Sequence, residues 1–320
     1  MWVYELKENK GEITKGNRSG NHSDKIKVKV LTSGINRRDV WIQQGLYPGI
    51  SYPIVLGSDA CVEYQDEQFL LNPNIDWGWD PKVPQSSYNI LGLENDGCFA
   101  ENVWVAEDRL CKVPSHMSTY EAGVLGLAGL TAYRALISNC KVEKKDSVFI
   151  NGIGGAVALM AMQFALALGC EVHVSSSSEA KLEEAIKMGA SGGTNYKNES
   201  WGKTYKKERG GFDVIIDSAG GKGFNELINL CNIGGRIGIY GGTRGKIEGI
   251  SPQHLFFKQI HIFGSTMGND EEFQLMLKFV EKYKIKPVID KVFPINKINE
   301  AFEYALDKNR FGKVCFRHDI

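Results

Sequence analysis

The sequence predicts an α/β protein in which a doubly wound parallel sheet occupies the middle of the chain. Three observations lead to this prediction. From Ser147 onward, short apolar segments alternate with longer amphipathic ones, in the rhythm of βαβ units. A glycine-rich segment directly follows the first of these apolar segments. The first third of the chain instead shows short alternating segments separated by Gly, Pro and Asn, a pattern typical of β-rich structure.

The middle of the chain supplies the strands and helices of this sheet in order. Each strand is a short run rich in Val, Ile or Phe, followed by a longer segment with helical periodicity. The predicted strands are 148–150, 171–175, 213–217 and 236–240, and the predicted helices are a long segment after the glycines that follow residue 150, 179–188 and 224–231. Because ligands of such sheets bind beyond the carboxyl ends of the strands, we expect the site there.

The two ends of the chain follow a different pattern. Residues 26–30 alternate polar and apolar side chains, and similar segments recur to about residue 113. Near the C-terminus we expect a helix over 270–283, a strand after Pro287, a helix over 296–306 and a strand over 313–317. Trp77 and Trp79 lie in a segment rich in Pro and Asn, where a surface lobe is favoured over the mouth of a substrate pocket.

Composition limits the classes of function. The 320 residues include 38 Lys and Arg against 38 Asp and Glu, with 42% hydrophobic residues and a mean hydropathy of −0.24, which favours a globular protein of two domains. The balanced charge lacks the basic footprint of nucleic-acid binding. The longest apolar stretch, 156–168, is too short to span a membrane, and the charged N-terminus does not resemble a signal peptide. We therefore predict a cytoplasmic protein.

The cysteines and histidines show no spacing typical of a metal site. Seven cysteines are scattered without a CxxC pair, and six histidines form no HxH, HxxxH or HExxH pattern. We expect reduced thiols and no metal ion.

A glycine-rich turn joins the first predicted strand to its helix. The segment from Gly152 through Ile153, Gly154, Gly155 and Ala156 to Val157 places glycines where the chain turns from strand to helix. Glycine lets the backbone approach a pyrophosphate, and the N–H groups of the helix start stabilise its charge. Strict GxGxxG spacing fails at Val157, so the motif alone is weak. Its βαβ context favours a dinucleotide site over an ordinary βα turn.

Four serines, at 175–178, stand at the end of the second predicted strand, where NAD-binding proteins carry an acidic residue for the ribose 2′-hydroxyl. The hydroxyls of Ser175, Ser176 and Ser177, together with Lys181, suit a 2′-phosphate. We therefore predict NADPH rather than NADH. The alternative is that the serines only cap the next helix and Lys181 is solvated.

Several short motifs occur together in a familiar order. They are GINRRD at 34–39, GLYP at 45–48, AGLTAYRAL at 128–136, the glycine turn, and GKV at 312–314. In this combination the chain resembles zinc-free, quinone-oxidoreductase-like members of the medium-chain dehydrogenase/reductase superfamily. The resemblance runs from about Lys25 to the C-terminus.

The resemblance implies a particular domain organisation. A Rossmann NADPH-binding domain, residues 116–264, would be inserted in a β-rich GroES-like catalytic domain built from residues 1–115 and 265–320. This organisation accounts for the β-rich ends around a βαβ centre.

The resemblance also implies the loss of zinc. Asn36, Ser58-Asp59 and Leu127 stand where zinc-dependent members carry ligands. Cys98 stands alone in the region where a structural zinc lobe would need four cysteines. We therefore expect no catalytic zinc.

The same resemblance implies the cofactor contacts. It assigns Asn36 and Thr131 to the nicotinamide, Gly152, Ile153, Gly154, Gly155, Ala156 and Val157 to the pyrophosphate, Ser177, Lys181 and Tyr196 to the 2′-phosphate, Gly241 and Gly242 to the nicotinamide ribose, and Ser265 to a turn approaching the nicotinamide. For the turn at Ser265, a hairpin or interface turn is an equal alternative.

The expected absence of a metal ion limits the classes of possible substrate. Quinones and α,β-unsaturated carbonyls accept hydride more easily than unactivated ketones, because the product anion is delocalised. Tyr47 is the leading proton donor, with a role in shaping the pocket as the alternative. Asn36 is expected to donate an amide hydrogen bond to a carbonyl or to position the nicotinamide ribose.

We therefore predict a zinc-independent oxidoreductase that transfers hydride from NADPH to a small-molecule quinone or enone. The alternatives are a zinc-free alcohol dehydrogenase or aldehyde reductase, and a non-catalytic NADPH-binding protein. Phe256-Phe257 and residues 260–263 form an apolar, strand-like patch near the sheet edge, which predicts a homodimer.

Overall fold

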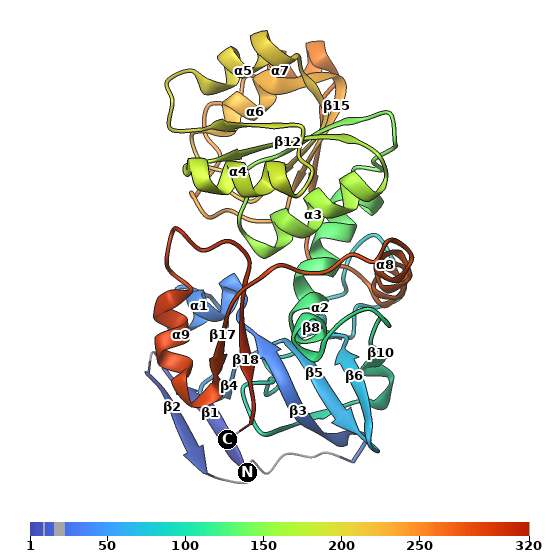
Figure 1. The fold of residues 1–320 in the computed structure, drawn as a ribbon, viewed down its shortest axis with the longest axis vertical. Helices are drawn as coiled ribbons and strands as arrows, with labels where there is room; N and C mark the ends of the chain where they lie inside the picture. Colours follow the sequence, from blue (N-terminus) through green and yellow to red (C-terminus); the bar gives the residue numbers. More distant parts are fainter. Residues whose placement is uncertain (9, 16–22, 320) are drawn as a thin grey trace. The chain divides into compact units, whose positions relative to one another are not determined.

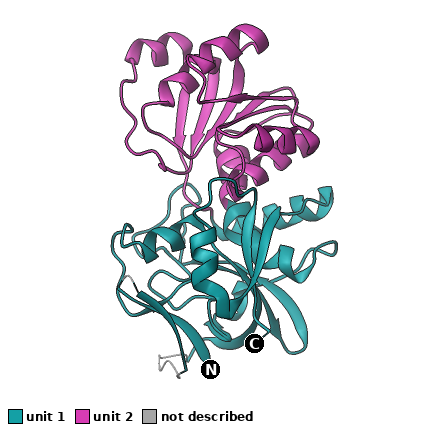
Figure 2. Ribbon diagram, turned by 60° about the vertical axis from the view of Figure 1, so that its left-hand side comes forward, with its two compact units in different colours: residues 1–130, 269–320 teal, residues 131–268 magenta. Residues whose placement is uncertain are grey.

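The structure is a computed structural model that describes residues 1–8, 10–15 and 23–319. The chain divides into two compact units, Met1–Leu130 with Asn269–Ile320 (unit 1) and Thr131–Gly268 (unit 2), shown in Figure 2. Unit 1 is built from both ends of the chain, and unit 2 is inserted between them. Each unit has a buried hydrophobic core of its own.

Unit 2 is a doubly wound α/β structure. Its strands are β11 (Ser147–Ile150), β12 (Glu171–Ser176), β13 (Gly192–Asn195), β14 (Phe212–Asp217), β15 (Cys231–Ile239) and β16 (His261–Gly264). They form a six-stranded parallel sheet in the order β13-β12-β11-β14-β15-β16. The chain leaves β11 in one direction through β12 and in the other through β14, so the topological switch point lies between β11 and β14.

Helices cover both faces of this sheet (Figure 1). They are α3 (Ala156–Ala167), α4 (Glu179–Lys187), α5 (Trp201–Arg209), α6 (Phe224–Leu230) and α7 (Pro252–Lys258), with the π-helical segment η2 (Arg134–Asn139). On one face, Trp201 and Tyr205 of α5 and Phe224 of α6 pack with Phe149 and Ile215 of the strands. The α3 and α4 helices lie on the other face, as right-handed crossovers require.

The predicted fold class is confirmed, and one local prediction is wrong. The strands and helices expected between residues 148 and 240 are present within a few residues of their predicted bounds. Phe256 and Phe257, however, lie in α7 rather than in a strand-like segment. Ser251 and Pro252 start this helix, because proline is pre-organised for the first helical turn.

Unit 1 is rich in β-structure. Its strands are β1 (Trp2–Lys7), β2 (Lys10–Lys15), β3 (Ile26–Gly34), β4 (Ile54–Val55), β5 (Asp59–Tyr64), β6 (Glu67–Leu71), β7 (Asn74–Ile75), β8 (Asn89–Ile90), β9 (Asn102–Val105), β10 (Leu110–Lys112), β17 (Ile289–Pro294) and β18 (Lys313–Arg317). The main sheet has the order β10-β6-β5-β3-β18-β17, and β9 pairs with β3. The C-terminal β18 therefore lies antiparallel to β3, which joins the two ends of the chain.

The helical segments of unit 1 complete this architecture. They are α1 (Arg37–Gln43), η1 (Glu107–Arg109), α2 (Thr119–Tyr133), α8 (Asp270–Tyr283), η3 (Ile295–Lys297) and α9 (Ile298–Tyr304). The short α1 follows β3 closely and places its N-terminus beside the start of β18. This junction holds the polar cluster described below.

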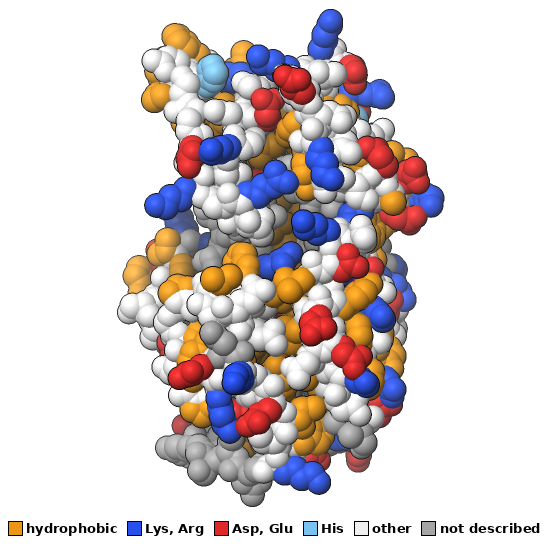
Figure 3. Space-filling model, turned by 90° about the vertical axis from the view of Figure 1, so that its left-hand side faces the viewer, with side chains coloured by type: hydrophobic (Ala, Val, Ile, Leu, Met, Phe, Trp, Pro, Cys, Tyr) orange, Lys and Arg blue, Asp and Glu red, His pale blue; other side chains and the backbone are white. Residues whose placement is uncertain are grey.

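The surface carries charges of both signs. On the face shown in Figure 3, Lys and Arg side chains are interspersed with Asp and Glu side chains. In the part of the chain that the structure describes, no helix combines the length and apolar character needed to cross a bilayer.

Candidate functional site

The turn after β11 allows close approach to its backbone. Gly152 and Gly154 have φ angles of +79° and +117°, in the region that favours glycine. A Cβ atom added at Gly152 or Gly155 would meet no heavy atom within 4 Å, so the turn is open on its outer side. α3 starts at Ala156 with no capping side chain among the described residues, which leaves its first N–H groups for a ligand.

A polar network holds this turn against the sheet. Ile153 N–H donates to the Ser175 carbonyl at 2.7 Å, and Gly152 N–H donates to Ser175 Oγ at 3.0 Å. Ser175 Oγ donates to Asn151 Oδ1 at 2.6 Å, and Asn151 Nδ2 donates to Asp217 Oδ1 at 2.7 Å. Ser175 is fully buried, so its hydroxyl supports the turn from within.

The first turn of α4 brings a cation beside the glycine turn. The Lys181 side chain lies against Gly154, where an added Cβ would stand 3.1 Å from Lys181 Nζ. Ser176 is buried and its Oγ accepts from Ser178 N–H at 3.2 Å, whereas Ser177 is half-buried. Ser178 is the N-cap residue of α4, but its side chain makes no cap hydrogen bond.

Tyr196 and Arg244 form a second polar element of unit 2. Tyr196 follows β13, and its N–H donates to the Ser176 carbonyl at 3.0 Å. The Arg244 guanidinium carbon lies 4.6 Å from the centroid of the Tyr196 ring, within the range of a cation–π contact. Arg244 belongs to the loop after β15, so residues from two strand ends meet here.

The loops after β14 and β15 also meet. Thr243 N–H donates to the Ser218 carbonyl at 3.0 Å, and a Cβ at Gly241 would lie 3.0 Å from the same oxygen. At Gly242 the nearest atom to such a Cβ is 4.0 Å away. Glycine at 241 thus permits the close approach of the two loops.

Thr131 and Ser265 complete the predicted set in unit 2. Ser265 N–H donates to the Ile239 carbonyl at 2.8 Å, and its Oγ is buried without a hydrogen-bond partner among the described residues. Thr131 Oγ1 lies 3.7 Å from Met267 Sδ. Both residues lie close to the end of the sheet at which β15 and β16 terminate.

In unit 1, Asn36 connects β3 to α1. It is the N-cap residue of α1, and its N–H donates to Asp39 Oδ2 at 2.7 Å within a capping box. Burial raises the pKa of Asp39, while Arg38 and the Asn36 N–H oppose the increase. This arrangement fixes the backbone of Asn36.

A buried ion pair fixes the side chain of Asn36. Lys313 Nζ donates to Asp59 Oδ2 at 2.8 Å, to Asn36 Oδ1 at 2.7 Å and to the Ile35 carbonyl at 3.2 Å. Asn36 Nδ2 donates to the same Asp59 oxygen at 3.0 Å. The side chains of Lys313 and Asp59 are 3% and 0% exposed. With a cation on Oδ1 and a carboxylate on Nδ2, the amide has one orientation and keeps a second N–H as a donor.

Asp59 also contacts Leu127, another position at which the resemblance implies that a zinc ligand has been replaced. Its Oδ1 accepts from Leu127 N–H at 2.6 Å. The neighbouring Ser58 donates to the Leu91 carbonyl at 2.8 Å and bonds to Arg38 Nη2. Asn36, Ser58-Asp59 and Leu127 therefore belong to one polar cluster, together with the cations Arg38 and Lys313.

This cluster does not fit a zinc ion. Asn36 Oδ1 and Asp59 Oδ2 both accept hydrogen bonds from the Lys313 ammonium group, which occupies the place of a metal cation. The residues of the cluster also include no cysteine or histidine, the side chains that zinc prefers. Among the residues that the structure describes, no three His, Cys, Asp or Glu side chains are grouped to hold a metal ion.

Tyr47 lies in the loop after α1. Its side chain is half-buried and packs against a hydrophobic cluster of unit 1 that includes Ile42, Leu56 and Phe99. The ring thus packs in the hydrophobic core of unit 1, and within the part of the chain that the structure describes it forms no hydrogen bond to the polar cluster.

Two residues of the site were not predicted from the sequence. Lys313 was noted only as part of a GKV motif, and Arg244 was not considered. A lysine directly before three apolar residues of a strand, as in KVCFR, is the signal that identifies Lys313, because such a lysine needs a buried partner. Arg244 has no comparable signal, since its loop is exposed.

Comparisons with known proteins agree with this geometry. Residues 156–282 match the family model for the zinc-binding dehydrogenases. The chain is 31% identical to a zinc-type alcohol dehydrogenase-like protein, YogA, of Leptosphaeria maculans, over 91% of this chain and 90% of that protein. It is 31% identical to human quinone oxidoreductase over 87% of this chain and 84% of that enzyme.

A solved structure extends the comparison to the fold. The crystal structure of an NAD-dependent alcohol dehydrogenase superposes with a TM-score of 0.91 and 28% identity, over 99% of each chain. The protein therefore belongs to the medium-chain dehydrogenase/reductase superfamily and is a quinone-oxidoreductase-like oxidoreductase. The resemblance seen in the motifs is confirmed.

Proposed function

We propose that the protein reduces a quinone or an α,β-unsaturated carbonyl compound with NADPH and without zinc. The cluster of Asn36, Asp59 and Lys313 is the observation that carries the proposal. It offers an oriented N–H donor for a carbonyl oxygen, and its cation is an ammonium group instead of a metal ion. Relatives named quinone oxidoreductase support the same substrate class.

The turn after β11 supports a nicotinamide dinucleotide as cofactor. Gly152 and Gly155 leave open space where a pyrophosphate requires it, and Ile153, Ala156 and Val157 contribute backbone of the turn and the helix start. Glycine at 154 lets the Lys181 ammonium lie against the turn. When bound, the nicotinamide supplies the hydride.

The surroundings of β12 support NADPH over NADH. The strand ends at Ser176 without the carboxylate that binds a ribose 2′-hydroxyl. Ser177 and Lys181 follow directly, and Arg244 on Tyr196 adds a second cation. We assign the 2′-phosphate to these four residues, and we assign Thr131, Gly241, Gly242 and Ser265 to the nicotinamide side.

Two donors of this chain serve the substrate. Hydride addition places negative charge on the carbonyl oxygen, and a donor in a water-poor site stabilises that charge. The free N–H of Asn36 takes this role because Lys313 and Asp59 prevent the amide from turning. Tyr47 supplies the proton, as a group that is partly buried yet reachable from solvent.

A zinc-free aldehyde reductase or alcohol dehydrogenase is the second candidate. The names of the Leptosphaeria relative and of the superposed crystal structure support the alcohol dehydrogenase class, and the zinc-free part of this candidate rests on the polar cluster of unit 1. The same Asn36 donor would serve an aldehyde oxygen, so substrate trials must include both classes.

The test is NADPH oxidation, followed at 340 nm, against quinones, enones and aldehydes with and without a chelator. We expect turnover of quinones or enones at a rate that does not change when the chelator is added. Tight NADPH binding without turnover would favour a non-catalytic protein. Chelator-sensitive turnover of aldehydes would refute the zinc-free proposal.

We also propose a homodimer formed through the edge of the unit 2 sheet. β16 is the last strand in the sheet order and pairs only with β15 among the described strands. Phe257 on the adjoining α7 is 76% exposed, and Ile233 is also exposed. Light scattering should give a dimer at micromolar concentration, and Phe257→Glu should give a monomer. A monomeric unmodified chain would refute this proposal.

A further inference from the structure

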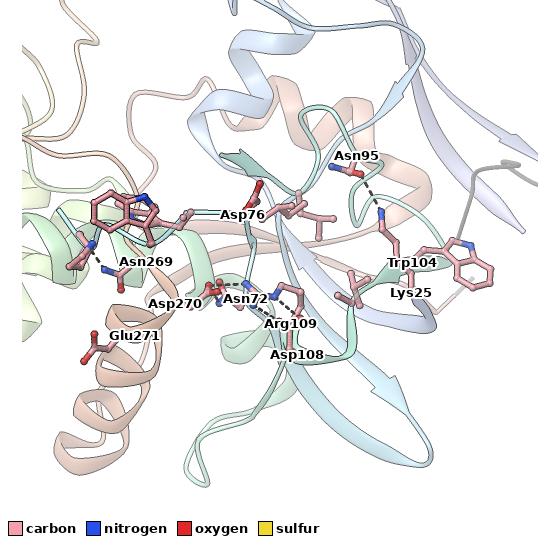
Figure 4. Close-up of a pocket in the computed structure, with 18 residues that line it drawn as sticks. Lys25, Asn72, Asp76, Asn95, Trp104, Asp108, Arg109, Asn269, Asp270 and Glu271 are labelled. Carbon is pink, nitrogen blue, oxygen red and sulfur yellow. Dashed lines mark hydrogen bonds and ion pairs between the residues drawn. The ribbon is translucent and has the colours of Figure 1, made fainter. Parts of the chain in front are cut away.

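Unit 1 contains a cavity of about 700 Å³ that includes none of the residues assigned above (Figure 4). Its walls come from the segment around β7, from η1 and the strand before it, and from the start of α8. The volume lies within the range of small-molecule sites, about 300–1,000 Å³. The cavity therefore has room for a ligand of its own.

Indole rings form much of the apolar wall. Trp77 is buried, donates from Nε1 to the Asp80 carbonyl at 2.9 Å, and meets Tyr88 edge to face at 4.9 Å between centroids. Trp79 stands two residues further on and is 90% exposed. Trp104, from β9, also lines the cavity and lies beside Lys25 in Figure 4. Three indole rings, one buried and one largely exposed, thus give a ligand several aromatic faces.

The arginine of the wall is already paired with carboxylates. Arg109 donates to Asp270 at 2.7 and 2.9 Å and to Asp108 at 2.8 Å. It also donates to the Asn74 carbonyl at 3.0 Å, and Asn72 Nδ2 donates to Asp270 at 2.7 Å. These contacts join η1, β7 and α8 at the wall of the cavity. A ligand anion would have to displace a carboxylate to reach Arg109.

The remaining charge of the wall is negative. Four carboxylates, on Asp76, Asp108, Asp270 and Glu271, face two cations, on Lys25 and Arg109, which leaves a formal charge of −2. Lys25 is hydrogen-bonded to Asn95 at 3.2 Å. Asp76 accepts from Ser87 Oγ at 2.6 Å, and neither Asp76 nor Glu271 has an ion-pair partner among the described residues. Two carboxylates of the wall are thus left without a counter-charge.

We propose that this cavity binds an organic cation with an aromatic or apolar body, such as an aryl-alkylammonium compound. Aromatic faces attract cations through their quadrupoles, and the carboxylates of Asp76 and Glu271 complement the same charge. The exposed surface of Trp79 gains burial when the apolar body lies against it. The inference is independent of the proposed reductase activity, because none of its residues takes part there.

The test uses three ligands of similar size, each titrated against the full chain without NADPH. They are phenylethylammonium, neutral 2-phenylethanol and anionic phenylacetate. Binding is followed by calorimetry and by tryptophan fluorescence excited at 295 nm, where these ligands do not absorb. We expect phenylethylammonium to bind about tenfold more tightly than the alcohol, phenylacetate not to bind, and added salt to weaken the cation.

Variants assign the binding to this cavity. Trp79→Ala should weaken the binding of phenylethylammonium by about tenfold. The double change Asp76→Asn with Glu271→Gln should weaken it by about as much and leave the binding of 2-phenylethanol nearly unchanged. These side chains are exposed or half-exposed, so the variants keep the fold. Asp66→Asn combined with Glu67→Gln, an equal change of two charges at an exposed turn outside the cavity, is the matched control and should have no effect.

Three results would overturn the proposal. One is equal affinity for the ammonium compound and the alcohol, which would make the cavity a purely apolar site. Another is phenylethylammonium binding that survives both the Trp79 and the carboxylate variants, which would place it elsewhere. The third is no binding at millimolar concentration.

Discussion

Replacing Lys313 by Met tests the buried ion pair directly. The substitution keeps a long unbranched side chain but removes the ammonium group that bonds to Asp59, Asn36 and the Ile35 carbonyl. At 2.8 Å and an effective dielectric constant of about 20, the lost attraction is roughly 6 kcal/mol. The variant no longer has the cost of removing an ammonium group from water, which offsets part of this loss. Asp59 also keeps its hydrogen bonds from Asn36 and Leu127. We expect the free energy of unfolding to fall by about 3–5 kcal/mol.

Urea unfolding followed by tryptophan fluorescence is the assay. Five of the six tryptophans, Trp2, Trp41, Trp77, Trp79 and Trp104, lie in unit 1, so the signal reports mainly the unit that contains the ion pair. Lys286→Met is the matched control: it removes a surface lysine 3.1 Å from Glu121 and should cost less than about 1 kcal/mol.

A double variant separates the charge effect from packing. Asp59→Asn combined with Lys313→Met removes both buried charges, and it should be more stable than Lys313→Met alone. A Lys313→Met protein whose unfolding midpoint matches that of Lys286→Met would refute the reasoning. In that case the ion pair would add nothing to stability, and the orientation assigned to the Asn36 amide would lose its support.

Three further predictions concern the cofactor, the reaction and pH. Lys181→Ala, and separately Arg244→Ala, should weaken NADPH binding about tenfold and leave NADH binding unchanged, as measured by quenching of protein fluorescence; equal losses for both nucleotides would count against the 2′-phosphate assignment. Tyr47→Phe should lower kcat about 10²-fold at constant NADPH affinity in the 340 nm assay, and unchanged turnover would remove Tyr47 from the chemistry. Burial lowers the pKa of His318 to about 4, whereas the pKa of histidine in the unfolded chain is about 6.5. As the pH falls below about 6.5, the unfolded chain therefore binds a proton that the folded protein does not bind. The free energy of unfolding should therefore fall by about 2 kcal/mol between pH 7 and pH 5, and His318→Gln should remove that part of the pH dependence.

Local signals accounted for most of the fold of unit 2. Apolar runs such as 148–150 and 213–217 are strands in the structure, and the glycines at 152–155 form the turn between β11 and α3. The order of the strands did not follow from these signals, because it depends on which crossovers pack on which face. α5 was missed because WGKTYKKER is mostly polar, and its buried face consists chiefly of Trp201 and Tyr205.

The misassigned segment before β16 shows the limit of periodicity. Phe256 and Phe257 are adjacent aromatic residues, which in isolation suit a strand. In the structure both lie in α7 and are exposed, so neither period 2 nor core packing determines their conformation. The Ser251-Pro252 pair was the better signal, because capping and the fixed φ of proline act locally.

The polar cluster of unit 1 was predictable only in part, because its residues are far apart in the sequence. The resemblance pointed to Asn36, Ser58-Asp59 and Leu127, but Lys313 lies 277 residues after Asn36 in the sequence. No local pattern links residues so far apart. Electrostatics nevertheless supplies a rule: a carboxylate expected in the interior, such as Asp59, requires a cation that is also interior.

That rule selects Lys313 from the lysines of the chain's C-terminal segment. Lys308 stands in a polar turn where water can solvate it, whereas Lys313 opens a strand whose next three residues are Val, Cys and Phe. A lysine in such a strand must either reach solvent or find a buried anion. Because β18 pairs with β3 at the residues just before Asn36, Asp59 is the anion within reach. The same pairing that closes the sheet of unit 1 thus brings the cation to the amide that we assign to the substrate carbonyl.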